Sequence, residues 1–211
     1  MLDVHPPHSR IDSIGEFFLH LFTITVGLLI ALALESAVEH QHHNSQRDQA
    51  ESDLRQEIGA NITQIAISQQ SIVQERANLV RAMQFLEARQ ANKSFDIRDL
   101  NLAFEIVPLT DASWRTASAT GVLSYINYEH VQHYAAAYHM QDQFASIQDE
   151  TLDSFLELHS YVVANANLTK MTPEEAGSAL LDVRHAYAHL DALDEIGKVA
   201  GKNYKDALAT Q

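Results

Sequence analysis

Cysteine is absent from this sequence of 211 residues, and glycine and proline are scarce, at seven and four residues. Without cysteine the chain can form no disulfide, no thiolate metal site and no c-type haem attachment. So few glycines and prolines leave little material for the tight turns of an all-β fold. The composition therefore predicts an all-α protein.

Positive charge is also in short supply, because 14 Lys and Arg residues stand against 28 Asp and Glu residues, for a formal net charge of -14. Binding to nucleic acid depends on cationic side chains that neutralise phosphates, so DNA and RNA are poor candidate partners. The sequence has no Gly-x-Ser-x-Gly elbow, no Walker loop and no Gly-x-Gly-x-x-Gly motif. We therefore expect no enzymatic activity and no cofactor.

A long apolar run lies near the N-terminus. From Phe17 to Leu34 it reads FFLHLFTITVGLLIALAL, and His20 is its only ionisable residue. A helix of this length extends about 27 Å, close to the roughly 30 Å of a bilayer's hydrocarbon core. Glu16 and Glu35 flank the run, where their carboxylates can reach water. The sequence thus predicts a short tail at 1–16, a transmembrane helix at 17–37 within the lipid bilayer, and a helical domain at 38–211.

The apolar run also has features of a cleavable signal peptide, because Ala31-Leu32-Ala33 fits a small-x-small cleavage site. It is longer, however, than the usual apolar region of about 7 to 15 residues, and Arg10 is its only preceding fixed cation. We therefore expect an uncleaved signal anchor. No Lys or Arg follows until Arg47, and this asymmetry favours an N-terminus inside and a domain outside. In a bacterium, this predicts the inner membrane with the C-terminal domain in the periplasm.

Small residues recur along the predicted span. Thr23, Gly27 and Ala31 are four residues apart, a pattern that lets two membrane helices approach closely through their backbones. The same spacing also arises in apolar helices from composition alone. Self-association, or docking on the span of another membrane subunit, is therefore a hypothesis.

Three long helical patterns follow the span. The first, at about 47–92, contains no proline, and its apolar residues follow three- and four-residue steps. The second, at about 127–165, begins at Asn127, a favourable N-cap residue. The third, at about 173–208, begins with Thr172-Pro173-Glu174-Glu175, which combines an N-cap, a first-turn proline and a capping-box glutamate. The apolar stripe of the first pattern consists of Leu54, Ile58, Ile62, Ile65, Ile72, Leu79, Met83 and Leu86.

The segment between the first two patterns is irregular. Asp96 and Thr110 are candidate N-caps of two short helices, which Pro108 would separate. Three amphipathic helices with one apolar stripe each can hide those stripes only against one another. The predicted fold is an elongated antiparallel bundle of three long helices plus short helices. Trp114, the only tryptophan, is predicted to anchor the irregular segment to this bundle.

Twelve histidines raise the question of a metal site. Asp182, His185 and His189 share one face of the third pattern, and two histidines four residues apart can chelate a transition metal. This face lies nearly opposite Val183 and Leu190, which predicts exposure to solvent. The sequence also lacks the paired Glu-x-x-His units of di-iron bundles. A solvated surface is therefore the expectation, with a metal site as the alternative.

Two further groups of histidines are less specific. His40, His42 and His43 follow the span, where they could bind metal, respond to pH or form a polar collar beside the membrane. His130 and His133 lie in the first turn of the second pattern. Neither group has the spacing of an established metal motif.

Three patches of the sequence form a familiar combination: Gly15-Glu16-Phe17, the span segment Val26 to Leu32, and LRQEIGAN from Leu54 to Asn61. This combination resembles an uncharacterised group of bacterial single-pass membrane proteins, in which a Gly-Ile/Leu-Leu-Ile-Ala-Leu span precedes an acidic helix ending in Glu-x-x-x-Asn. Trp114 and Gly121, which lead into a helix rich in tyrosine, are similar to a second segment of that group. The resemblance implies a membrane-anchored helical domain and supplies no activity.

Two functions are compatible with these patterns. The first is a non-enzymatic, membrane-anchored interaction protein, either an accessory subunit of a larger envelope complex or a self-associating scaffold. The alternative is a sensor or metal-binding helical bundle that uses one of the histidine clusters.

Overall fold

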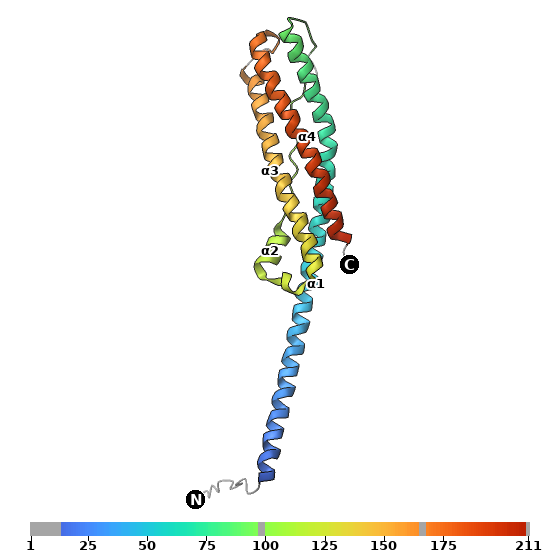
Figure 1. Ribbon diagram of the computed structural model, residues 1–211, viewed down its shortest axis with the longest axis vertical. Coiled ribbons are helices and arrows are strands. Elements are labelled where there is room, and N and C mark those ends of the chain that lie inside the picture. The colour runs from blue at the N-terminus through green and yellow to red at the C-terminus, as the bar shows by residue number, and fades with distance from the viewer. Residues whose placement is uncertain (1–13, 97–99, 165–167, 210–211) are drawn as a thin grey trace, which may run out of the picture. The chain divides into compact units, whose positions relative to one another are not determined.

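The computed structural model describes residues 14–96, 100–164 and 168–209. These residues form four α-helices and two short 3₁₀ helices and contain no strand (Figure 1), which confirms the predicted all-α class. The chain divides into two compact units, Met1–Asp48 and Gln49–Gln211. The elements are α1 (Ile14–Gln90), α2 (Ala112–Thr120), η1 (Val122–Tyr125), α3 (Tyr128–Ala164), η2 (Leu168–Lys170) and α4 (Pro173–Ala209).

The described part of the first unit is the N-terminal portion of α1. Its most apolar window of 18 residues has a mean hydropathy of 2.4, and none of that window is buried. The hydroxyls of Thr23 and Thr25 donate to the carbonyls of Leu19 and Leu21, one turn back, so both are satisfied within the helix. By length and composition, this helix could span a membrane.

The helix does not end after its apolar portion. The sequence predicted a transmembrane helix and a separate bundle helix beginning near Arg47, whereas α1 is continuous through this region. Between Leu34 and Leu54 the sequence contains neither proline nor glycine, so no residue there breaks the backbone hydrogen-bond pattern. The same helix thus contributes to both units.

In the second unit, α1 and α4 run in opposite directions. The Arg55 guanidinium donates to the carbonyl of Leu208 at one end of the pair, at 3.0 Å. At the other end, the Arg89 guanidinium donates to the carbonyl of Met171 at 2.6 Å. Neither carbonyl has a hydrogen-bond donor within a helix, because Leu208 lies in the last turn of α4 and Met171 lies just before its start. The two arginines supply those donors.

In contrast, α1 and α3 run in the same direction. His130, near the start of α3, contacts Glu51 at 2.9 Å, and the Asn61 amide donates to Gln141 at 3.0 Å. The parallel direction is possible because the chain returns along the bundle between the two helices (Figure 1). Residues 100–110, which we call the strap, form this return and have no regular secondary structure.

One of the two short helices that the sequence predicted is present: α2 begins one residue later than the helix expected after Thr110, with Asp111 as its N-cap. The other short helix, expected after Asp96, would begin in residues 97–99, which lie outside the described residues, and residues 100–110 contain no helix. From residue 100 to residue 105 the side chains alternate between half-buried and exposed, a period of two that is typical of extended backbone. The half-buried side chains are Leu100, Leu102 and Phe104, which all pack against the core.

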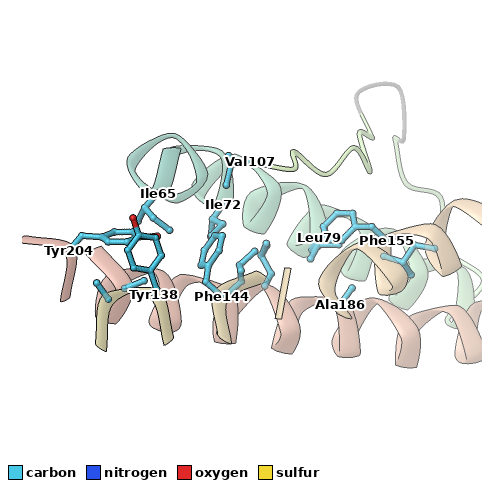
Figure 2. Close-up of a cluster of buried hydrophobic side chains, with 14 of the residues drawn as sticks. Ile65, Ile72, Leu79, Val107, Tyr138, Phe144, Phe155, Ala186 and Tyr204 are labelled. Carbon is cyan, nitrogen blue, oxygen red and sulfur yellow. The ribbon is translucent and has the colours of Figure 1, made fainter. Parts of the chain in front are cut away.

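One hydrophobic cluster joins α1, α3, α4 and the strap (Figure 2). Full burial of such side chains stabilises a fold by about 1.5 to 3 kcal/mol each. On α4, Gly197 allows close packing, since a Cβ placed there would lie 3.3 Å from the Phe144 ring. The labelled members of the cluster are Ile65, Ile72, Leu79, Val107, Tyr138, Phe144, Phe155, Ala186 and Tyr204, each no more than 3 % exposed.

Candidate functional site

Polar residues recur within the buried stripe of α1. Asn61, Ser68 and Glu75 are seven residues apart, and each is at most 5 % exposed. A buried polar group that lacks a hydrogen bond costs about 1 to 3 kcal/mol, so such residues normally have partners inside the fold. For Asn61 and Glu75 those partners include the strap.

The Asn61 carboxamide binds the backbone of Thr110 at the end of the strap. The Thr110 N–H donates to Oδ1 at 3.0 Å, and Nδ2 donates to the Thr110 carbonyl at 2.7 Å. Gln141 on α3 donates to the same carbonyl at 3.1 Å, and the Tyr204 hydroxyl on α4 donates to Gln141 at 2.7 Å. Burial raises the pKa of Tyr204, which keeps this hydroxyl a donor.

A second hydrogen-bond network joins α1 to the start of α2 and to α3. The Glu57 carboxylate accepts the Ser113 N–H at 3.0 Å and the Tyr138 hydroxyl at 2.6 Å. Burial, and then the hydrogen bond to Glu57, raise the pKa of Tyr138. The Trp114 ring stacks on Tyr138 with centroids 5.3 Å apart and planes at 12°. Trp114 therefore lies half-buried where α2 meets α3.

Glu75 occupies the centre of the contact between α1 and the strap. Its Oε1 accepts the backbone N–H of Glu105 at 2.8 Å, while the Glu105 carboxylate accepts the hydroxyl of Ser71, one turn earlier on α1. The other oxygen of Glu75, Oε2, is buried and has no hydrogen-bond partner among the described residues. Burial raises the pKa of Glu75 to about 7. The hydrogen bond from the Glu105 N–H opposes this rise, and the negative charge of the Glu105 carboxylate adds to it.

An open groove of about 730 Å³ lies over Glu75, between α1 and the strap. Its acidic members are Glu75 and Glu105, and none of its lining residues is Lys, Arg or His. Side-chain amides supply further oxygen acceptors, and a few apolar side chains complete the walls. The remaining lining residues are Ile67, Gln70, Ser71, Val73, Gln74, Asn78, Asn101, Ala103 and Phe104.

The candidate metal residues on α4 are engaged separately. Asp182 accepts the Tyr161 hydroxyl at 2.6 Å, and this hydrogen bond, followed by burial, raises the pKa of Tyr161 to about 12. His189 is half-buried and contacts the Ser154 hydroxyl at 2.7 Å, whereas His185 is exposed, as its helix face predicted. Over the described ranges, no group of three or more His, Cys, Asp or Glu side chains could hold a metal ion.

The other predicted residues are not among those that line the groove. Thr23, Gly27 and Ala31 are exposed on the apolar part of α1, and nothing lies within 4 Å of a Cβ placed at Gly27. His42 and His43 lie on the same helix, with ring centroids 6.4 Å apart. The exposed positions Thr23, Gly27 and Ala31 stay candidates for contacts outside the chain.

Neither Glu75 nor the side chains that bind the backbone of the strap were predicted from the sequence. The available signal was the stripe itself: Ile72 and Leu79 flank Glu75 at steps of three and four, so a carboxylate occupies a core position. A charged residue at such a position is rarely buried unless it is paired or neutral. Read this way, Glu75 would have been the leading candidate site residue.

No family model matches this chain, and searches of curated proteins and of solved structures find no match to it.

Proposed function

We propose that this chain is a non-enzymatic, membrane-anchored interaction protein, either an accessory subunit of a larger envelope complex or a self-associating scaffold. The observation that carries the proposal is the apolar portion of α1, whose mean hydropathy reaches 2.4 while none of it is buried. An apolar surface of that extent is unfavourable in water, so lipid or other protein must cover it.

The second unit supports an interaction role. It is a bundle with a continuous core, and residues 49–211 contain 22 Asp and Glu against 12 Lys and Arg. The absence of lysine and arginine between Arg10 and Arg47 is the basis for proposing a bacterial inner-membrane protein with the bundle in the periplasm. The resemblance to bacterial single-pass proteins agrees with this topology.

The missing cysteines make the sidedness simple to test. Ser52 is exposed, so Ser52→Cys gives the chain a single thiol at the start of the bundle. A membrane-impermeant maleimide should label this variant in intact spheroplasts. Labelling only after the membrane is permeabilised would place the bundle in the cytoplasm instead.

The interaction role is tested by the native mass of the untagged chain, extracted gently from the membranes of its own host. Other chains that co-purify in a fixed ratio would identify an accessory subunit. A multiple of the chain's own mass would identify a scaffold. A stable monomer without partners would contradict the proposal.

A further inference from the structure

Glu75, which lines the groove between α1 and the strap, has a buried carboxyl oxygen with an unused hydrogen-bonding position. Glu75 is only 5 % exposed, and its Oε2 has no partner among the described residues. A buried carboxyl group must stay protonated or be paired with a cation, because an isolated buried charge is costly. A cationic group that reaches this oxygen from the groove would satisfy it.

The lining of the groove is complementary to such a cation. Glu105 adds a second carboxylate beside Glu75, and the amides of Gln74 and Asn101 supply further acceptors. The described lining residues include no cation that could compete. The chain's net charge of -14 further attracts positive groups from solution.

The geometry favours an ammonium over a guanidinium or a metal. One oxygen of Glu75 already accepts the N–H of Glu105, so only its second oxygen is available. A guanidinium binds best to both oxygens of one carboxylate, whereas an ammonium donates three separate hydrogen bonds to acceptors on different residues. The groove offers only two carboxylates. Within the described ranges, no group of three or more His, Cys, Asp or Glu side chains could hold a metal ion.

We propose that this groove receives a lysine side chain of a protein partner, whose ammonium binds between the carboxylates of Glu75 and Glu105. The inference rests on the proposed interaction function and names the chemistry of the partner. The apolar lining residues Val73 and Phe104 offer a surface for the methylene groups of that lysine. Because an ammonium stabilises ionised Glu75, docking lowers the pKa of this carboxyl and releases a proton near neutral pH.

The test uses the full chain in micelles of a neutral detergent, with ¹³C at the glutamate carboxyl carbons. Glu75→Gln removes one resonance and thereby assigns it. The probe is Nα-acetyl-lysine N-methylamide, added at constant ionic strength. We expect its addition to lower the titration midpoint of Glu75 by about one pH unit, which is a tenfold preference for the ionised form. The Nε-acetylated probe, which is neutral, should leave the midpoint unchanged.

Two carboxylate variants define the position of the ammonium. Glu105→Gln should weaken binding of the lysine probe by several-fold and keep the backbone N–H that donates to Glu75. Glu150→Gln is the matched control, because Glu150 is exposed on α3 and outside the groove. Equal affinities in both variants would remove Glu105 from the site.

Other outcomes overturn the proposal. No change in the Glu75 midpoint with the lysine probe would eliminate the site. Much tighter binding of putrescine than of the lysine probe would make a free polyamine the ligand instead of a protein. Each result is independent of the native-mass measurement, because the titration uses the purified chain alone.

Discussion

Gln148 on α3 binds both polar atoms of the Val107 backbone: the Val107 N–H donates to Oε1 at 3.0 Å, and Nε2 donates to the Val107 carbonyl at 3.2 Å. Asn61 on α1 binds Thr110 in the same manner, three residues further along the strap. These carboxamides satisfy backbone groups that a neighbouring β-strand would otherwise satisfy. The strap can therefore lie extended against helices.

Replacement of Gln148 by alanine should loosen the strap. The change leaves the N–H and the carbonyl of Val107 without partners in a buried site, at a cost of about 1 to 3 kcal/mol for each group that water does not reach. We expect a loss of about 2 to 4 kcal/mol in the free energy of unfolding. Urea unfolding in neutral detergent can be followed by the fluorescence of Trp114, the only tryptophan.

Gln143→Ala is the matched control for this prediction, since Gln143 lies exposed on the same helix. It should change stability by less than about 0.5 kcal/mol. Hydrogen exchange at the amide of Val107 gives a local reading, which should accelerate only in the Gln148 variant. Similar exchange in both variants would show that the hydrogen bonds between Gln148 and Val107 do not hold the strap in place.

The start of α4 and the end of α1 were predicted well from local sequence. The predicted capping box at Thr172 is present. The Glu175 carboxylate accepts the Thr172 N–H at 2.7 Å, and the Glu175 N–H donates to the Thr172 hydroxyl at 3.2 Å. The first long pattern was predicted to end at Asn92, and α1 ends at Gln90, with Asn92 at a φ of 54°. Both features depend on residues that are neighbours in the sequence.

The strap and the groove could not be predicted in the same way. Their hydrogen bonds join residues far apart in the chain, such as Gln148 with Val107 and Glu75 with Glu105. Pro108 was read as a separator of two short helices, although extended backbone accommodates proline equally well. Local propensity therefore left this segment undecided, and its partners on α1 and α3 determine its conformation.

Two glycines in long helices should respond oppositely to alanine. Nothing lies within 4 Å of a Cβ placed at Gly59, so Gly59→Ala should stabilise the bundle by about 0.5 to 1 kcal/mol through reduced backbone entropy. At Gly197 the new Cβ meets the ring of Phe144 at 3.3 Å, and this ring is fully buried. Gly197→Ala should therefore stabilise the bundle less than Gly59→Ala does, or destabilise it. Equal stabilisation in both variants would show that the ring can move.

A charge in the centre of the apolar portion of α1 should impair membrane insertion. Leu29 is exposed there, and arginine at the centre of a transmembrane helix costs about 3 kcal/mol relative to leucine. We expect Leu29→Arg to lower the fraction of chain that resists alkaline carbonate extraction, whereas Leu29→Ala should remain in the membrane. Equal retention of all three chains would argue against a span at this position.

Stability should fall as the pH rises towards neutrality, because the folded state favours the protonated form of Glu75. Its pKa rises from 4.5 to about 7 on folding, so between these values the native state binds more protons than the unfolded state. This contribution is fully present below about pH 4.5 and is lost as the pH passes through about 7. The full difference corresponds to roughly 3 kcal/mol.

Glu75→Gln isolates this contribution, because glutamine keeps an oxygen for the Glu105 N–H and carries no charge at any pH. The stability difference between Glu75→Gln and the wild type should therefore grow in favour of the variant between pH 5 and pH 8, by about 2 to 3 kcal/mol. Urea unfolding across this pH range, without added amines, measures that difference. Glu150→Gln should track the wild type at every pH, since Glu150 is exposed. A difference for Glu75→Gln that stays constant with pH would mean that Glu75 ionises equally in the folded and unfolded chains.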